Sequence, residues 1–375
     1  MKKWIGCLGF VLLTFGTMAQ EKQMVHSVIV EWHDADWYKK QEKLWKADLD
    51  LNKQNGDAWL NYYAASRALR ILSEANSAEE KKYLEQCTAI AKDAYANMPN
   101  SFEGNYIMYW NSNHFENKNE QYLIKAFELR PEDPRVLLDY LIKAELEQDK
   151  ATFSKVAKKL YEINRMPAGA LNWAYNVLTE VSENGIVLTA GDNDTYALWI
   201  AQEAFNYRKD VKVINTSLIL FDDYRSKLFK DLGLGPIEMA SPTLFFKQIF
   251  ENKAKIPVHV STSASNDFKD SSITDNLYLT GLTYLYSLED IENIAVIKRN
   301  FEKRFLLDHL TKTFSYSYGD LDARIKHMYL PALMKLYLHS KTADDLEEIA
   351  YYKGLIDAIA KELDIEAEIK KALEQ

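Results

Sequence analysis

The residues best suited to chemistry form one short polar turn and a second polar group that follows a later apolar run. Two carboxylates separated by one residue can coordinate a hard cation such as Ca²⁺ or Mg²⁺. Acidic side chains are equally typical of a helix N-terminus, where Asp, Asn and Thr accept the first free backbone N–H groups. The sequence leaves metal binding and helix capping open. The candidate ligand-binding residues are Asp192, Asn193, Asp194, Thr195, Asn215 and Ser217.

Other reaction chemistries fit the sequence less well, and no catalytic residue is predicted. An apolar run followed by Asp-x-Asp is similar to the haloacid dehalogenase phosphatases, but Gly191 separates the run from Asp192 and Thr195 stands where that family has Gly. The histidines lack His-Glu-x-x-His spacing and the serines lack a Gly-x-Ser-x-Gly elbow. We therefore expect no cofactor.

The elements that hold the polar turn follow an α/β pattern from Asn184 onward. Short apolar runs bounded by turns predict buried strands at 185–190, 211–215 and 256–260, with helices at 196–208, 222–232 and 242–252. The run 277–286 predicts one more strand or a hairpin. Residues 182–290 are thus predicted to form a small, doubly wound, Rossmann-like domain. Ligands of such sheets bind at the carboxyl ends of the strands, where the candidate residues fall.

One family resemblance accompanies these elements. The stretches NGIVLTAGDNDTYALW (184–199), DVKVINTSL (210–218) and LTGLTY (279–284) resemble the soluble region of a bacterial membrane-protein family. Its members carry a multispanning glycosyltransferase-like part of the protein O-mannosyltransferase type. The resemblance covers residues 184–290 and does not extend to that catalytic part. It therefore implies recognition of a protein or glycan at the cell envelope, and not glycosyl transfer.

The part before the α/β pattern is predicted to be helical and repetitive. Apolar residues at helical spacing run from 36 to 181, and Pro99, Pro131 and Pro167 are 32 and 36 residues apart. A period near 34 residues resembles tetratricopeptide helix pairs, of which about four would fit. We expect residues 20–181 to form such a repeat domain, with a concave surface for a peptide or protein partner. A plain helical bundle without a groove is the alternative.

Helices return after the α/β pattern, over residues 291–375. Helical patterns cover 291–310, 320–339 and 343–373, and Pro331 should kink or split the second of them. The predicted fold class is therefore α+α/β, with tetratricopeptide-like N-terminal repeats, a central doubly wound domain and C-terminal helices.

The first nineteen residues have the pattern of a secretion signal. Lys2 and Lys3 precede a short apolar stretch, and small residues Thr17 and Ala19 flank Met18. Cleavage after Ala19 would direct the chain to the periplasm or the medium, while an uncleaved anchor is the alternative. Removing these residues takes away two lysines and no acid, which changes the formal net charge from −9 to −11.

The composition of the remaining chain excludes some partners. An acidic chain without a Lys/Arg cluster lacks the footprint needed to bind nucleic acid. No later apolar stretch is long enough to span a membrane. Cleavage removes Cys7 and leaves Cys87 as the one thiol, so no internal disulfide can form.

The sequence thus predicts an exported, soluble, non-enzymatic binding or adaptor protein of the cell envelope. Its repeats would bind a protein or peptide, and its α/β domain would bind a second ligand, with a glycan or glycoprotein as a candidate. The alternative is a metal-dependent hydrolase or glycan-processing enzyme that uses the loop of Asp192 and Asp194.

Overall fold

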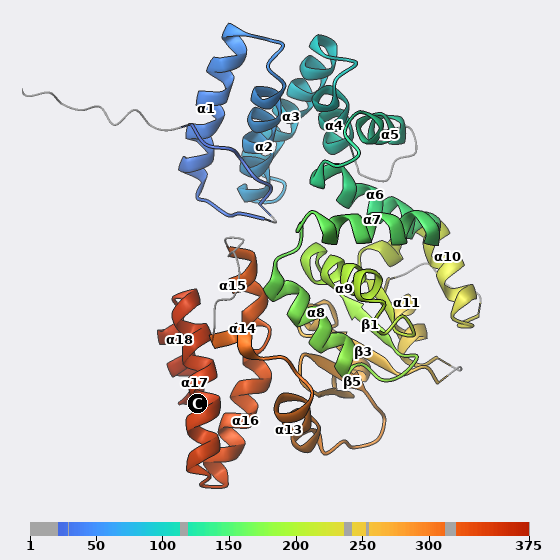
Figure 1. Cartoon of the computed structure of the whole chain (residues 1–375), viewed down its shortest axis with the longest axis vertical. Helices are drawn as coiled ribbons and strands as arrows, with labels where there is room; N and C mark the ends of the chain where they lie inside the picture. The colour runs from blue at the N-terminus through green and yellow to red at the C-terminus, as the bar shows by residue number, and fades with distance from the viewer. Residues whose placement is uncertain are drawn as a thin grey trace, which may run out of the picture.

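The computed structural model describes residues 22–28, 30–112, 119–235, 242–252, 255–311 and 320–374 (Figure 1). The predicted signal peptide, residues 1–19, lies outside these residues. Among the described residues, no helix combines the length and apolarity that crossing a bilayer requires. This agrees with the expected lack of a membrane span after the signal.

In the described residues, helices α1 to α7 form the first part of the chain, which we call the helical arm, and α8 joins it to a sheet. Consecutive helices pack against each other, and α2 also packs against α4. Side-chain oxygens cap several of the helix N-termini, including those of α2, α3, α4 and α6. The elements are α1 (Ala35–Leu51), α2 (Gly56–Leu72), α3 (Ala78–Asn97), α4 (Phe102–Asn111), α5 (Glu120–Leu129), α6 (Pro134–Glu147), α7 (Lys150–Glu162) and α8 (Ala168–Glu180).

Three turns of the arm share one hydrogen-bond pattern. They connect α1 to α2, α3 to α4 and α5 to α6. In each turn, the backbone N–H of the next helix's N-cap donates to the carbonyl of the preceding helix's C-cap, three residues earlier, at 3.2, 3.2 and 3.1 Å. The N-cap residues are Asn55, Ser101 and Asp133. Helix pairs α2/α3, α4/α5 and α6/α7 therefore start in the same way.

The prolines used to predict the repeat period lie at helix ends. Pro99 and Pro131 directly follow the C-caps of α3 and α5. Pro167 instead is the N-cap of α8, so it begins a helix rather than ending α7. The spacing of the N-caps is also uneven, because α2 and α3 are both longer than α4 and α5.

The sheet has five strands in the order β2-β1-β3-β5-β4. The strands β1 (Ile186–Thr189), β2 (Lys212–Asn215) and β3 (Val258–Ser261) are parallel, with Val187 between Val213 and His259. The hairpin β4 (Leu277–Leu279) and β5 (Thr283–Tyr286) adds antiparallel strands beside β3. The predicted α+α/β class is compatible with this architecture, but the sheet is mixed, and the segment 277–286 is a hairpin.

The helix after β1 begins earlier than predicted. We expected a turn at 191–195 and a helix from Tyr196, whereas α9 spans Asp192–Phe205. Asp192 and Asp194 therefore occupy the first helical turn. The reason is one half of a capping box, in which the Asp194 carboxylate accepts the backbone N–H of the N-cap Gly191.

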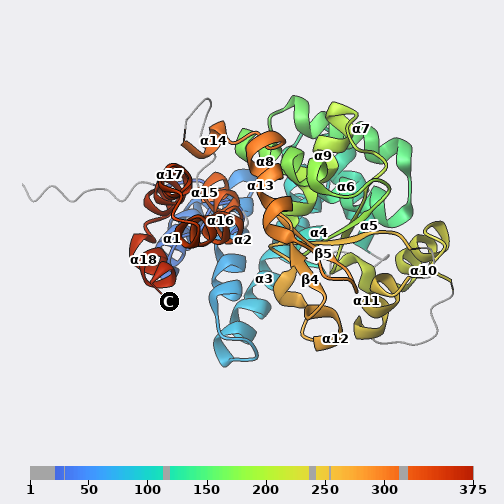
Figure 2. The ribbon, with the colours of Figure 1, turned by 90° about the horizontal axis from the view of Figure 1, so that it is seen from below.

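The remaining helices are of two kinds. Some lie near the sheet, and those at the C-terminal end of the chain form a separate group. Figures 1 and 2 show the C-terminal helices gathered to one side of the sheet. Pro331 is the second residue of α16, and the predicted helix 320–339 is indeed split before it. The elements are α10 (Asp222–Asp231), α11 (Pro242–Phe250), α12 (Ser271–Thr274), α13 (Asn293–Lys303), α14 (Asp308–Thr311), α15 (Asp320–His327), α16 (Leu330–Thr342), α17 (Leu346–Leu363) and α18 (Glu366–Leu373).

Helix α8 joins the sheet to the chain that follows it, because Asn176 binds the chain at Leu306 and Glu180 binds the β4–β5 hairpin. The Asn176 side chain donates to the Leu306 carbonyl at 2.9 Å and accepts from the Leu306 N–H at 2.8 Å. One turn later, the buried Glu180 carboxylate accepts from the backbone N–H of Leu282 at 2.7 Å and of Thr283 at 3.3 Å. The hydroxyls of Thr280 and Thr283 donate to it as well.

The turn of the β4–β5 hairpin is thus built around a buried carboxylate. Gly281 has φ +155°, and a Cβ there would lie 2.7 Å from a Glu180 oxygen, so glycine is required. Buried His259 continues the network, since Nε2 accepts from the Ser182 N–H at 3.1 Å and Nδ1 lies 2.8 Å from the Thr283 hydroxyl. Burial lowers the pKa of His259 to about 3, so the ring is neutral.

Helix α6 takes part in two hydrophobic cores. Val136 belongs to the core of the arm, whereas Leu137 and Leu141 belong to the core that surrounds the sheet. Near the end of α6, the buried Glu145 carboxylate accepts from Lys212 of β2 at 2.9 Å and from the Tyr224 hydroxyl of α10 at 2.7 Å. The arm is therefore tied to the sheet by both packing and charge.

Replacing the carboxylate that organises the hairpin tests this account of α8. We expect Glu180→Ala to lower the free energy of unfolding by about 2–4 kcal/mol, because two backbone N–H groups lose a buried acceptor. Urea denaturation measures the change. The exposed Glu183 supplies the control, and Glu183→Ala should stay within about 0.5 kcal/mol of the wild type. Equal effects of the two variants would contradict the proposed role of Glu180.

Candidate functional site

Asp194 lies at the carboxyl ends of the parallel strands and is fully engaged by its neighbours. Its Oδ1 accepts from the backbone N–H of Gly191 and of Thr195, each at 2.9 Å, and its Oδ2 accepts from the Ala190 N–H at 3.2 Å. The Ser263 hydroxyl, in the loop after β3, also donates to Oδ2. The side chain is 2% exposed. Burial raises the pKa of this carboxyl, and the four hydrogen bonds oppose that rise.

Thr195 and Asn215 complete a buried network next to Asp194. The Asn215 amide donates to Thr195 Oγ1 at 2.9 Å, and its carbonyl oxygen accepts from the backbone N–H of Ser217 at 2.8 Å and of Leu218 at 3.1 Å. Thr195 Oγ1 also donates to the Gly191 carbonyl at 2.6 Å. These contacts fasten the start of α9 to the end of β2, so the side chains shape the strand ends from within.

The six predicted residues therefore do not form one open site. Asp194, Thr195 and Asn215 are brought together, as the strand-end rule predicted, but they are buried. Ser217 is exposed and contributes its backbone N–H to this network. Asp192 and Asn193 are half-buried on the first turn of α9.

Asp192 belongs to a second polar group, in which α9 meets the arm. The Tyr196 hydroxyl is hydrogen-bonded to Asp192, and burial raises the pKa of that carboxyl. On the arm, the Tyr106 hydroxyl donates to the buried Asp139 carboxylate at 3.0 Å. Burial raises the pKa of Asp139 to about 7 against the Tyr106 hydrogen bond, and the charge of Asp192 adds to the rise. The pair Tyr106 and Asp139 on the arm and the pair Asp192 and Tyr196 on α9 are thus coupled through the charges of the two carboxyls.

A metal site is not found within the part of the chain that the structure describes. There, no three His, Cys, Asp or Glu side chains come together in a group that could hold an ion.

Sequence reasoning missed several polar residues that matter here. Ser263 follows β3 directly, so the strand-end rule that selected Asn215 would also have selected it. Asp139 carried no local signal, because its partners Tyr106 and Asp192 come from α4 and α9. Glu180 and His259 were missed for the same reason.

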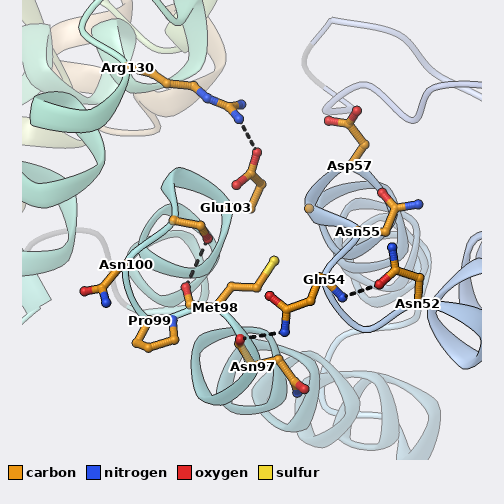
Figure 3. A pocket seen from close by; sticks show the side chains of 12 residues that line it. Asn52, Gln54, Asn55, Asp57, Asn97, Met98, Pro99, Asn100, Glu103 and Arg130 are labelled. Atoms are coloured by element: carbon orange, nitrogen blue, oxygen red, sulfur yellow. Dashed lines mark hydrogen bonds and ion pairs between the residues drawn. The ribbon is translucent and has the colours of Figure 1, made fainter.

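The arm carries an open polar pocket with a volume of about 740 Å³ (Figure 3). All three of the matching turns contribute to it, the third through Arg130. Arg130 forms an ion pair with Glu103, and the Gln54 amide donates to the Asn97 carbonyl at 3.1 Å across the pocket. Amide side chains dominate the lining and include Asn52, Gln54, Asn55, Asn97 and Asn100.

The structure thus contains a mixed sheet flanked by the helical arm. Buried polar side chains fill the space at the carboxyl ends of its parallel strands. Residues 170–232 match the family described as TMEM260-associated domain 2. The match runs from α8 to α10, so it includes the Asp194 network and overlaps the resemblance predicted from residues 184–290. It agrees in outline with that resemblance, since the family is associated with a membrane glycosyltransferase-like protein. Neither a curated protein nor a solved structure matches this chain.

Two neighbouring acids should respond differently to removal of their charge. Asp194→Asn should lower the free energy of unfolding by about 1–3 kcal/mol, because an amide cannot accept all the hydrogen bonds that the carboxylate receives. Asp192→Asn should leave it unchanged or raise it, because burial disfavours the charged carboxylate. Thermal and urea denaturation at pH 7.5 measure both. Equal losses in both variants would be inconsistent with this division of roles.

Asp139 should make stability depend on pH. Its folded-state pKa of about 7 lies above the usual value of 3.8, so between these pH values the folded chain keeps a proton that the unfolded chain releases. Stability therefore falls as the pH rises from about 4 to about 7, by at most about 1.4 kcal/mol per pH unit. In Asp139→Asn this contribution should vanish, whereas the exposed Asp93→Asn should follow the wild type. Parallel curves for wild type and Asp139→Asn would refute the assignment.

Proposed function

We propose that this chain is an exported, soluble binding or adaptor protein of the bacterial cell envelope, periplasmic or secreted, and that it is non-enzymatic. Its arm, a set of degenerate tetratricopeptide-like repeats, would hold a protein or peptide partner. Its α/β part would serve as a platform for a second ligand, with a glycan or glycoprotein as the candidate class.

The main support for this proposal is that the candidate residues at the strand ends use their polar atoms in hydrogen bonds within the protein. Asp194, Thr195 and Asn215 direct their polar atoms into hydrogen bonds that cap α9 and fasten the strand ends together. A nucleophile or metal ligand must instead present a polar atom to a substrate or an ion. The residues at this edge thus support a scaffold role.

The arm supports the binding role through its surface chemistry. Three matching turns border one pocket, and its amide groups can both donate and accept hydrogen bonds. The nearby charges balance in part, because Arg130 is paired with Glu103. Such a surface suits a polar partner without strong net charge.

The alternative function, a metal-dependent hydrolase or glycan-processing enzyme using Asp192 and Asp194, makes a different demand. It requires Mg²⁺ or Ca²⁺ to raise the melting temperature and Asp192→Asn to abolish that rise. EDTA should have no effect if the adaptor proposal is correct. A metal-dependent shift in the wild type would favour the enzyme.

Crosslinking followed by affinity capture from the source cells tests the adaptor proposal. The wild-type chain should retain a discrete partner, and the pocket variant Gln54→Ala/Asn100→Ala should lose at least about half of it, because both side chains line the pocket. The control Glu366→Ala/Glu368→Ala changes two exposed residues of α18 and should retain the partner. Capture of nothing above background by the wild type would overturn the proposal.

A further inference from the structure

An extended segment at the start of the described chain, residues 22–28, lies along α1 and α2. The backbone N–H of Gln23 donates to the Gln41 amide oxygen at 2.9 Å, and that of Val25 donates to the Asn61 amide oxygen at 2.6 Å. The Trp45 indole N–H donates to the Gln23 carbonyl at 2.8 Å. All three bonds use the main chain of the segment. Helices α1 and α2 therefore bind the backbone of this segment through their own side chains.

The same surface accepts two apolar side chains. Val25 and Val28 are 6% and 9% exposed, and they pack with Tyr38 and a set of small residues of α2. Met24 and His26 point outward and are exposed. We call this surface the N-terminal groove, and its lining residues are Tyr38, Gln41, Trp45, Asn61, Ala64 and Ala68.

The groove holds the side chain of Asn61 in the orientation that binding a backbone N–H requires. Asn61 is 7% exposed, and its amide N–H donates to the Asp57 carbonyl at 2.7 Å, which fixes the direction of its oxygen. The oxygen then receives the Val25 N–H. A buried amide acceptor left without a donor is unfavourable. Alanine at positions 64 and 68 leaves space beside α2 that branched side chains fill.

We propose that the N-terminal groove is a binding site for an extended peptide, and that residues 22–28 are a tethered occupant that a partner's peptide displaces. The ligand class is an extended segment with apolar, β-branched residues at two positions three apart. This inference rests on the proposed function, because it adds to the polar pocket a second place at which the arm binds its partner. A tethered segment competes at high effective concentration, so it keeps the groove filled until a better ligand arrives.

Much of the segment is open to solvent, which suits exchange. Lys22, Gln23, Met24 and His26 are exposed, whereas Val25 and Val28 are the buried side chains. Segments with few buried contacts open locally without global unfolding. A structural cap of the first helix pair would instead open together with α1 and α2.

Peptide binding in trans tests the proposal. The probe is a fluorescent peptide with the sequence KQMVHSVIVE of residues 22–31, and the readout is anisotropy. The variant Val25→Asp/Val28→Asp releases the tethered segment and should bind the probe at least about ten times more tightly than the wild type. Adding Asn61→Ala should weaken binding at least about tenfold, whereas adding Asn100→Ala, outside the groove, should not. A probe with aspartate in place of both valines should not bind.

Other results would contradict the peptide-binding proposal or the adaptor proposal. A released variant that keeps the wild-type circular dichroism but fails to bind the probe overturns the proposal. Concentration-dependent dimerisation of the wild type would indicate that a second copy of the chain occupies the groove. That result would contradict the proposal that a partner's peptide binds there. Peptide binding that fails while the captured partner is retained removes this inference alone, and the reverse result removes the adaptor proposal.

Amide hydrogen exchange on the wild-type chain keeps the test valid if the released variant does not fold. The amide protons of Gln23 and Val25 should exchange at least about a hundred times faster than those in the middle of α2. Equal exchange of the segment and α2 would show a permanent cap and overturn the proposal.

Discussion

The structure depends on one buried face of α8. Along this face, Asn176 binds the chain at Leu306, and Glu180 receives the turn of the β4–β5 hairpin. Desolvating a carboxylate is unfavourable unless its oxygens are hydrogen-bonded, so the hairpin turn must present its N–H groups and threonine hydroxyls together. This requirement fixes the hairpin beside β3 and, through it, the edge of the sheet. Helix α8 is also where the matched family region begins.

A second constraint operates at the carboxyl ends of the parallel strands, the same end at which the hairpin turn meets β3. In open α/β sheets the crevice between the loops after neighbouring strands is the usual ligand position. Here Asp194 bridges that crevice, since it follows β1 and accepts from Ser263 after β3. The polar residues that make the sequence look reactive are the ones that seal this edge. The charge of the half-buried Asp192 acts instead on Asp139 of the arm, whose pKa it raises.

Local patterns predicted the elements well, and long-range contacts account for what was missed. The three parallel strands, the hairpin at 277–286 and the break at Pro331 all follow from periodicity and turn residues in short windows. The start of α9 was misplaced by four residues, because the capping acid Asp194 was read as part of a turn. Glu180 and Leu282 are 102 residues apart, and no local pattern reports their hydrogen bond. The same holds for Asp139, whose neighbours come from α4 and α9, and for the groove that holds residues 22–28.

Helix α6 has a mechanical consequence. Its residues belong to the core of the arm and to the core of the sheet, so a tilt of the arm cannot occur without rotating this helix. Such a rotation moves Glu145, whose two partners stand on β2 and α10. The helix has one face in each core, so a force applied to the arm reaches the edge strand β2 through Glu145 and Lys212.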